Sequence, residues 1–422
     1  MKNINIAIIG LGYVGLPLAI EFGKKYETLG FDLDELRVEE LKNKNDKTLE
    51  VKSNSFETAI HLSFTTEIEM IKGCNTYIIT VPTPIDKENN PDLSHVIDAT
   101  KMIGSILKQD DLIIYESTVY PGLTEEICIP ILEEESGLEC NDGFLCGYSP
   151  ERINPGDTKH TLTNIVKVTS GSNAIAAKKV DKLYSSIIKA GTFSAKNIKV
   201  AEAAKVIENT QRDINIALIN EISQMFSHLD IDTQAVLEAA GTKWNFLNFQ
   251  PGLVGGHCIG VDPYYLTYKA SQIGYKSQVI LAGRSINDGM AGFIANKSLK
   301  MLEENGKKIS ESNVLVMGIS FKENCPDIRN SKAIDLVYLL ENAGCMVDIY
   351  DPWVEFDKTK ESLNINLLEY PNKGEYDLII ITTKHSQFAE FGINEIRTFN
   401  SENGLIYDLK SLFSEEEVDV RL

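Results

Sequence analysis

Three glycines near the N-terminus constrain the possible fold more strongly than any other feature of this sequence. Gly10, Gly12 and Gly15 follow the apolar segment Asn5–Ile9 and precede the helical pattern of Leu16–Phe22. Between a strand and a helix, glycines at this spacing allow a tight turn, close approach of the backbone to a pyrophosphate, and close packing of the helix on the strand. The N-terminus of that helix would offer amide groups to the phosphates. We therefore assign a dinucleotide to the turn formed by Gly10, Gly12, Tyr13, Val14 and Gly15.

An acidic residue at the end of the second expected strand specifies which dinucleotide binds. Asp32 directly follows the segment Thr28–Phe31. A carboxylate at this point accepts hydrogen bonds from the ribose hydroxyls and repels a 2′-phosphate, so the sequence favours NAD over NADP as the cofactor. Arg37 lies one turn further on, where it would cover the adenine or reach a phosphate. A purely structural glycine turn is the alternative, and it would not explain Asp32.

Apolar runs alternate with helical patterns in the N-terminal part of the chain, and the alternation resumes at Asn313 after a largely helical stretch. This pattern is typical of parallel, doubly wound sheets. We therefore expect an α/β chain with two Rossmann-like domains, joined by a long central helix and a helical dimerisation region. The expected strands are Ile4–Ile9, Thr28–Phe31, Thr76–Val81, Leu112–Glu116, Phe144–Tyr148, Ile165–Val168, Val314–Gly318, Met346–Tyr350, Leu378–Thr382 and Gly404–Tyr407.

The central helix is expected over Ala201–Leu229, a segment without glycine or proline in which apolar residues recur at helical spacing. At 1.5 Å per residue it would be roughly 45 Å long. A helix of this length commonly joins two domains or forms a dimer interface. A second helix precedes Gly241, and a third runs from about Ser277 to Glu304. We expect domains at residues 1–197, 198–305 and 306–422.

Charge and composition exclude several functional classes. The net charge is −20, from 41 basic and 61 acidic residues, which argues against nucleic acid as a partner but permits a local basic pocket. No apolar run approaches the roughly 18 residues of a membrane span, and the N-terminus enters a strand-like run without a signal peptide. Seven cysteines without a C-x-x-C pair and six scattered histidines argue against disulfides and a metal site. We expect a cytoplasmic protein that binds neither a metal nor a membrane.

A lone cysteine in a glycine-rich loop is the candidate nucleophile. Cys258 follows Gly255, Gly256 and His257 and precedes Asp262. An isolated cysteine is usually a small buried hydrophobic residue. Here, however, the two glycines suggest close approach of the backbone to a ligand, and the polar flank makes a simple core position less natural. A thiol beside a nicotinamide can trap an aldehyde and allow a second oxidation, so the pattern predicts a four-electron conversion of an alcohol to an acid.

Polar residues in other segments complete a candidate site. Lys205 and Asn209 share one face of the central helix, either as a solvated pair or as groups that would stabilise a thiolate and an oxyanion. Glu151 and Arg152 lie in the irregular loop Gly147–Gly156, and Tyr115–Thr118 ends a strand at the edge where parallel sheets bind ligands. Two cations, Lys322 and Arg329, follow another strand and suit a diphosphate. Each segment alone is equally consistent with a surface loop, but together they suggest one cleft between two α/β domains.

In order and spacing, these segments resemble the UDP-glucose/GDP-mannose dehydrogenase family over nearly the whole chain. The resemblance implies an N-terminal NAD domain, a central helical dimerisation region and a C-terminal UDP-binding domain, and with them a homodimer formed through the central helix. It also implies oxidation of C6 of a nucleotide sugar with two molecules of NAD. The matching motifs are Gly10–Gly15, Val81–Pro84, Ser117–Val119, Ser149–Gly156, Lys205 with Asn209, Gly255–Asp262 and Phe321–Ser331.

The resemblance further implies roles for individual residues. Cys258 matches the nucleophile, and Lys205, Asn209 and Asp262 match groups that transfer protons, place water and stabilise the oxyanion. Glu151 matches a hydrolytic glutamate. The implied NAD contacts include Thr83, Thr118 and Arg329, of which Thr118 also contacts water. The implied substrate contacts are Glu151, Arg152, Lys205, Asn209, Phe249, Gly252 and Lys322.

The substrate class follows from a departure within the resemblance. UDP-glucose members carry an arginine before the glycine loop, and Gly241–Leu247 contains none. This segment, Gly252–Cys258 and Arg284–Asn287 resemble the branch that acts on UDP-N-acetylhexosamines for capsule or O-antigen synthesis. The resemblance therefore implies UDP-N-acetylglucosamine or UDP-N-acetylgalactosamine and leaves the epimer open. UDP-N-acetylmannosamine and UDP-glucose remain alternatives, as do a two-electron dehydrogenase of the hydroxyacid type and a non-catalytic nucleotide-sugar sensor.

The hypothesis for the reaction has three stages. Lys205, or a water held by Thr118 and Asp262, removes the hydroxyl proton during the first oxidation. Cys258 then attacks the aldehyde, with Lys205 and Asn209 stabilising the oxyanion, and a second oxidation leaves a thioester. Water aided by Glu151 or Asp262 finally hydrolyses this thioester to the uronate.

Overall fold

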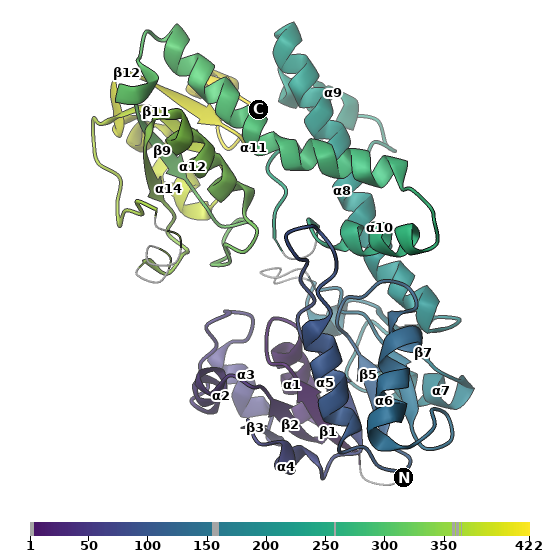
Figure 1. Cartoon of the computed structure of the whole chain (residues 1–422). Coiled ribbons are helices and arrows are strands. Elements are labelled where there is room, and N and C mark those ends of the chain that lie inside the picture. The colour runs from purple at the N-terminus through teal and green to yellow at the C-terminus, as the bar shows by residue number, and fades with distance from the viewer. Residues whose placement is uncertain (1–3, 154–159, 257–258, 357–358, 360–362, 364) are drawn as a thin grey trace. The chain divides into compact units, whose positions relative to one another are not determined.

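The computed structural model describes residues 4–153, 160–256, 259–356, 359, 363 and 365–422. The chain divides into two compact units. Unit 1 comprises Met1–Glu208 and Tyr264–Tyr275, and unit 2 comprises Asn209–Pro263 and Lys276–Leu422. The long helix α8, Ile198–Leu229, begins in unit 1 and continues into unit 2 (Figure 1).

Unit 1 is built on an eight-stranded sheet in the order β3-β2-β1-β4-β5-β6-β7-β8. Its strands are β1 Asn5–Ile9, β2 Glu27–Phe31, β3 Leu62–Thr65, β4 Thr76–Ile79, β5 Leu112–Tyr115, β6 Leu145–Tyr148, β7 Lys167–Gly171 and β8 Thr192–Ser194. Its helices are α1 Gly15–Gly23, α2 Glu35–Lys42, α3 Ser53–Thr58, α4 Ile68–Ile71, α5 Ser94–Gly104, α6 Ile129–Ser136 and α7 Ala174–Ser185. Strand order reverses between β1 and β4, the point at which open parallel sheets bind ligands.

One pair of strands departs from the predicted parallel arrangement. β6 and β7 pair antiparallel, with Gly147 opposite Gly171 and Tyr148 opposite Ser170. β7 is Lys167–Gly171, so the predicted strand Ile165–Val168 begins and ends too early. Parallel neighbours need a crossover connection, whereas an antiparallel neighbour can be reached by a loop that returns along the same edge. The segment after β6 forms such a loop, with only the short 3-10 turn Leu162–Asn164 among its described residues.

Unit 2 contains the second α/β layer structure, a five-stranded, all-parallel sheet in the order β10-β9-β11-β12-β13. The strands are β9 Asn313–Met317, β10 Met346–Tyr350, β11 Tyr376–Ile381, β12 Asn400–Asp408 and β13 Val420–Arg421. The helices that pack on it are α11 Gln278–Glu304, α12 Lys332–Ala343 and α14 Ser386–Arg397.

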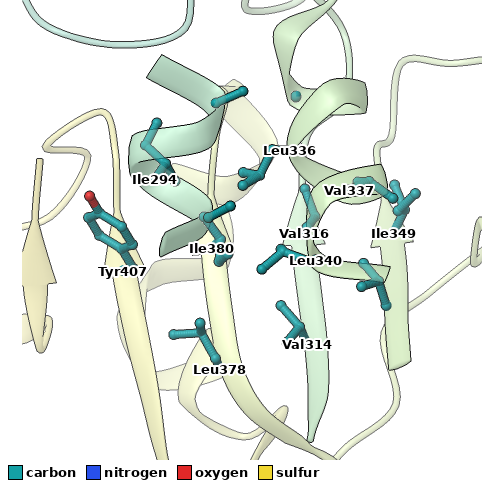
Figure 2. Packing of buried hydrophobic residues seen from close by; sticks show 14 of the residues in the cluster. Ile294, Val314, Val316, Leu336, Val337, Leu340, Ile349, Leu378, Ile380 and Tyr407 are labelled. Atoms are coloured by element: carbon teal, nitrogen blue, oxygen red, sulfur yellow. The ribbon is translucent and has the colours of Figure 1, made fainter. Parts of the chain in front are cut away.

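The side chains of the central strands in unit 2 alternate between the two faces of the sheet, and helices cover both faces. Val314 and Val316 of β9 belong to one buried cluster with α11 and α12, and Leu315 and Met317 belong to another with α14. Successive side chains of a strand point to opposite faces, so a strand covered on both sides becomes apolar throughout. Figure 2 shows the first cluster, in which Ile294 and Leu336 approach the strands from their helices. The two-domain Rossmann-type fold predicted from the sequence is confirmed.

The helical stretch between the two sheets contains α8, then α9 Thr233–Gly241 and α10 Asp262–Gln272. α8 starts three residues before the predicted Ala201 and ends at the predicted Leu229. The sequence prediction missed α10, and it also missed the short strands β3 and β8. None of the helices in the described part of the chain combines the length and apolar character needed to cross a membrane.

Candidate active site

The glycine turn after β1 has the geometry that its sequence predicts. Gly10 has a φ of +93°, a region that favours glycine, and its amide donates a 2.8 Å hydrogen bond to the carbonyl of Phe31. A Cβ on Gly15 would lie 1.8 Å from the Gly10 carbonyl oxygen, whereas a Cβ on Gly12 would meet nothing within 4 Å. Gly15 is therefore required for packing, and the space beside Gly12 is open to a ligand.

These residues fit a bound dinucleotide. The N-cap residue of α1, Val14, provides no side-chain capping bond, so the N-terminus of the helix is not closed by a side chain. Thr80, at the end of β4, donates to the carbonyl of Gly10 at 2.7 Å and fixes the turn from below. Open space at Gly12, close packing at Gly15 and an uncapped helix N-terminus are what a pyrophosphate requires.

Asp32 is held at the predicted position by backbone amides. Its Oδ2 accepts a 2.7 Å hydrogen bond from Leu11 N, and its Oδ1 accepts one of 3.0 Å from Asp34 N. Each carboxylate oxygen can accept two hydrogen bonds, so capacity for ribose hydroxyls remains. Arg37 is more constrained than the sequence suggested. Its guanidinium contacts Asp46 at 2.9 Å, and its Nε donates to the carbonyl of Leu11 at 3.0 Å.

The loops after β4 and β5 are bonded to each other. Thr83 Oγ1 donates a 2.7 Å hydrogen bond to the carbonyl of Thr118, and Ser117 Oγ donates one of the same length to the carbonyl of Val81. The hydroxyl of Tyr265, from α10, donates to the carbonyl of Thr83 at 2.9 Å. Two residues predicted to contact NAD, Thr83 and Thr118, therefore lie together at the carboxyl edge of the sheet.

Glu151 belongs to a buried cluster of charges that the sequence did not reveal. Its Oε1 accepts hydrogen bonds from Arg152 N at 2.6 Å and Ile153 N at 2.7 Å. Its Oε2 lies 2.8 Å from Nζ of Lys167, a residue of β7 that also lies 2.7 Å from Glu116 Oε2. The Lys167 and Glu116 side chains are fully buried. Burial raises the pKa of Glu116 to about 7, against the opposing effect of the Lys167 charge.

Arg152 lies outside this cluster and is bonded to α8. Its guanidinium approaches Glu208 to 2.7 Å, and its Nη1 donates to the carbonyl of Val166 at 3.0 Å. The predicted substrate contact of Arg152 would therefore compete with an ion pair. The rest of the predicted loop, Asn154–Gly156, lies outside the described residues.

On α8, Lys205 lies one helical turn before Asn209, and Lys205 is buried. Asn209 Nδ2 donates a 2.5 Å hydrogen bond to Oδ2 of Asp262, the buried first residue of α10. The sequence placed these three groups together, and the structure joins two of them directly. The predicted nucleophile, Cys258, and its neighbour His257 lie outside the described residues.

The glycines before Cys258 approach another segment of the chain. A Cβ on Gly255 would lie 2.4 Å from the carbonyl oxygen of Asn330, and a Cβ on Gly256 would lie 2.7 Å from the ring of Phe321. The structure gives both glycines a packing role, and close approach to a ligand at these positions stays a prediction. They allow the loop to pack on the segment between β9 and α12. Gly252, by contrast, borders Lys410, whose Nζ would lie 2.9 Å from a Cβ at that position.

A basic pocket in unit 2 contains Lys322 of the predicted substrate contacts. Two further lysines, Lys332 and Lys410, line it with the hydroxyl groups of Ser320 and Thr383. Burial lowers the pKa of Lys410, although the nearby Glu323 works against this shift. Arg329 does not line the pocket; its Nη2 lies 2.5 Å from Asp327 Oδ2. Phe249, the other residue predicted to contact the substrate here, is half-buried outside the pocket lining.

Sequence reasoning missed several of these residues, among them Thr80, Lys167, Lys332 and Lys410. Lys410 and Thr80 follow the strands β12 and β4, so the rule that ligands bind at strand carboxyl ends could have identified both. Lys332 directly follows the recognised segment Phe321–Ser331. Lys167 offered no such signal, because its partners lie 16 and 51 residues away in sequence.

Comparisons with known proteins match this chain along nearly its whole length. Residues 4–188 match the NAD binding domain of the UDP-glucose/GDP-mannose dehydrogenase family, residues 199–289 its central domain and residues 315–415 its UDP binding domain. A UDP-N-acetyl-D-glucosamine 6-dehydrogenase from Salmonella typhi is 54% identical over 422 residues, which cover 100% of this chain and 99% of that protein. A protein of the same name from Pseudomonas aeruginosa is 52% identical, with 100% of both chains covered.

A solved structure agrees with the sequence matches. That of the UDP-D-ManNAc dehydrogenase from Pyrococcus horikoshii superposes with a TM-score of 0.87 at 30% identity, covering 99% of this chain and 98% of that one. The chain thus belongs to the UDP-glucose/GDP-mannose dehydrogenase family, whose members are NAD-dependent oxidoreductases.

Proposed function

We propose that this enzyme oxidises C6 of UDP-N-acetyl-D-glucosamine to the carboxylate, with two molecules of NAD, for the synthesis of a surface polysaccharide. The observation that carries this assignment is 54% identity along the whole chain to a UDP-N-acetyl-D-glucosamine 6-dehydrogenase. The absence of arginine from Gly241–Leu247 also favours an N-acetylhexosamine over glucose. The C4 epimer, UDP-N-acetylgalactosamine, is the second candidate.

The cofactor would bind in unit 1. The turn Gly10–Gly15 would hold its pyrophosphate, Asp32 its adenosine ribose, and Thr83 and Thr118 its nicotinamide end. When bound, NAD supplies the hydride acceptor. Hydrogen bonds from the amides of Leu11 and Asp34 hold the Asp32 carboxylate in place. That carboxylate would repel a 2′-phosphate and so exclude NADP.

The UDP moiety would bind to the basic pocket of unit 2. Lys322, Lys332 and Lys410 supply positive charge for a diphosphate in a chain whose net charge is −20. Ser320 and Thr383 add hydroxyl groups that donate to the carbonyls of Lys322 and Ser320, so their oxygens can accept hydrogen bonds from a nucleoside. The positive charge of this pocket would therefore attract the substrate, although the chain as a whole is negatively charged.

The reacting C6 would be served by Lys205, Asn209, Asp262 and Cys258. Asp262 accepts the amide hydrogen of Asn209, which orients the carboxamide and leaves its oxygen and second N–H for substrate or water. The buried ammonium of Lys205 would stabilise the oxyanion formed when the Cys258 thiolate adds to the aldehyde. Loss of one such donor typically costs about 10²–10³ in rate. Glu151 would then take a proton from the water that hydrolyses the thioester.

Product stoichiometry tests this function. With limiting UDP-N-acetyl-D-glucosamine and excess NAD, we expect two NADH and one uronate per sugar, and a lower kcat/KM with UDP-N-acetylgalactosamine, UDP-N-acetylmannosamine and UDP-glucose. One NADH per sugar would indicate an aldehyde product, and no NADH with any substrate would favour a nucleotide-sugar sensor.

The variant Cys258→Ser provides the matched control. A serine can add to the aldehyde but gives an ester in place of a thioester, so turnover should stall while the NAD and UDP sites stay intact. Full four-electron turnover by this variant would exclude the thioester route.

We also propose that the protein is a cytoplasmic homodimer. The six described cysteines form no disulfide, in keeping with a reducing compartment. Along α8, large apolar side chains at Ile207, Leu218, Met225 and Leu229 are each more than half exposed. Their spacing of 11, 7 and 4 residues follows one side of the helix, so together they form an apolar stripe suited to a second copy of the chain.

A further inference from the structure

A lysine inside the sheet of unit 1 joins two carboxylates. Lys167 Nζ lies 2.7 Å from Glu116 and 2.8 Å from Glu151, and its ammonium lies 5.4 Å from the ring centre of Tyr184. The Tyr184 hydroxyl donates to the second oxygen of Glu116. These groups come from four elements: the end of β5, the loop after β6, β7 and α7. Burying three charges is costly unless they are paired, so the sequence retains them at an energetic cost.

The charges of this cluster do not balance when every group is ionised. One ammonium faces two carboxylates, which leaves a net charge of −1 in a buried site. Binding one proton makes the cluster neutral. Burial, together with the Glu151 charge, raises the pKa of Glu116 to about 7, in spite of the Lys167 charge and the Tyr184 hydrogen bond. Burial alone would lower the pKa of Lys167, but the two carboxylates raise it, so Lys167 stays a cation. Glu116 is thus the group that gains or loses the proton.

Glu151 is the member nearest to bulk solvent, with a side-chain exposure of 6% against 0% for Lys167 and Glu116. Its Oε1 is occupied by two backbone amides, and its Oε2 accepts from Lys167. A carboxylate oxygen can accept two hydrogen bonds, so Oε2 keeps one position for a water molecule. A proton collected there would be one hydrogen bond from Lys167.

Resting on the function proposed above, we propose that Glu116 and Lys167 are positioning residues for thioester hydrolysis: Lys167 fixes the Glu151 carboxylate, and Glu116 receives across Lys167 the proton that Glu151 takes from water. The attacking water forms a C–O bond to the acyl carbon, the C–S bond breaks, and Cys258 leaves as the thiolate. The water proton passes to Glu151. Glu151 then gives a proton to Lys167 while Lys167 gives one to Glu116, which restores the Glu151 carboxylate and the Lys167 cation. The product leaves as the carboxylic acid and ionises to the uronate in water. Before the next turnover the reverse transfers return the proton from Glu116 through Lys167 to Glu151, which releases it to solvent.

The direction of the pH dependence follows from this transfer. Glu116 can accept a proton only while it is ionised, and its pKa of about 7 therefore makes hydrolysis slow below pH 7 and fast above it. The titratable groups that face Glu116 are Lys167, Glu151 and Tyr184. The Tyr184 hydrogen bond lowers the pKa of Glu116, so its removal would move the rise in rate to higher pH.

Rapid-quench measurements with NAD and UDP-N-acetyl-D-glucosamine test this inference on the full-length enzyme. The wild type should release uronate at a rate that rises through about pH 7. Glu116→Gln should form two NADH per site in a first turnover, then release uronate about tenfold more slowly at pH 8, without the rise near neutrality. Intact-mass spectrometry should detect the accumulated acyl-enzyme.

Tyr184→Phe is the matched control, because it alters Glu116 without removing its charge. It should keep the rise in rate but shift it to higher pH, and both variants should bind NAD and unfold thermally as the wild type does. A rise near pH 7 that persists unchanged in Glu116→Gln would overturn the inference, as would loss of the rise in Tyr184→Phe. A wild type that releases no uronate would refute the proposed function itself, whereas normal wild-type stoichiometry with an unaltered Glu116→Gln profile would refute this inference alone.

Discussion

The carboxamide of Asn220 fixes the backbone at Gly252, which precedes the loop of the proposed nucleophile Cys258. On α8, its Oδ1 accepts a 2.8 Å hydrogen bond from Gly252 N, and its Nδ2 donates to Gly252 O at 3.0 Å. The same Nδ2 donates to Asn287 Oδ1 at 2.8 Å, and Asn287 in turn donates to Asp213 Oδ1 at 2.7 Å. Arg284 completes the network with a 2.6 Å contact to Asp213. Each member needs the others, because a buried polar group without its partner is costly.

Asn220→Asp should therefore be strongly destabilising although it keeps the shape of the side chain. The carboxylate cannot donate to Gly252 O or Asn287 Oδ1 and would face two oxygens inside unit 2. We expect a loss of about 2–4 kcal/mol in the free energy of unfolding, measured in urea, and a marked loss of kcat. Asn215→Asp on the same helix is the control, because its Nδ2 donates only to the carbonyl of Gln211 at the surface. An equal effect of both substitutions would show that the Asn220 carboxamide does not fix the backbone at Gly252.

Much of this residue-level arrangement could not be read from the sequence. The glycine turn and Asp32 are local features, so spacing alone located them. Gly255 was recognised as a site of close approach, but the approaching group is the Asn330 carbonyl, 75 residues further along the chain, which spacing does not reveal. Lys167 is the first residue of β7, and its carboxylate partners lie 16 and 51 residues away, so no local pattern marks it as buried.

At the scale of elements, the two sheets repeat one strand–turn arrangement. Gly318 follows β9 with a φ of +97°, and its amide donates to Tyr350 O at 2.8 Å, as Gly10 donates to Phe31 O. Asp351 accepts from Ile319 N at 2.8 Å, as Asp32 accepts from Leu11 N at 2.7 Å. The hydroxyl of Thr382, which follows β11, donates to the carbonyl of Met317 in β9. In the same way, the hydroxyl of Thr80, which follows β4, donates to the carbonyl of Ile9 in β1. In both units, equivalent hydrogen bonds therefore hold the turn that follows the first strand of the sheet.

Substitutions should separate the roles of Gly12 and Gly15, the second and third glycines of the turn after β1. Gly12→Ala adds a methyl group where nothing lies within 4 Å, so the free energy of unfolding should change by less than about 0.5 kcal/mol. The same methyl group would occupy the space assigned to the pyrophosphate, and Kd for NAD should rise about tenfold, or about 1.4 kcal/mol. Calorimetric titration with NAD and urea unfolding measure the two effects.

Gly15→Ala is the counterpart. Its methyl group would meet the Gly10 carbonyl at 1.8 Å, so both stability and NAD binding should fall. A Gly12→Ala variant that binds NAD normally would place the pyrophosphate elsewhere.

The sequence predicted the elements that have long hydrophobic patterns and missed those whose patterns are short. The central strands and α8 carry uninterrupted apolar patterns, and their predicted bounds differ from the structure by a few residues. β3, Leu62–Thr65, and β8, Thr192–Ser194, are short edge or outer strands with little apolar character. α10 begins at Asp262, inside a segment whose glycines and proline suggested a loop. Direction of pairing, as in β6 with β7, depends on the connection and not on the strand.

At the scale of the whole molecule, exposed apolar surface predicts assembly. The stripe on α8 includes Leu218, with 51% of its surface exposed, and Leu229, with 59%. Trp244, which follows α9 in the same unit, is 92% exposed. Apolar area left in water forgoes about 25 cal/mol per Å² of burial, and contiguous exposed apolar residues mark interaction surfaces. A closed two-fold dimer would cover the stripe of each copy with that of the other.

Leu218→Asp should therefore dissociate the dimer. The substitution would bury two unpaired carboxylates at a two-fold interface, a cost of several kcal/mol, and each increment of about 1.4 kcal/mol weakens association about tenfold. Sedimentation velocity should detect dimers for the wild type and monomers for the variant at equal concentration. Ile60→Asp is the control, because Ile60 is 77% exposed and belongs to unit 1 but not to α8, so its substitution should leave the dimer intact. A monomeric wild type, or a Leu218→Asp variant that sediments as the wild type does, would show that the stripe on α8 is not the interface between copies.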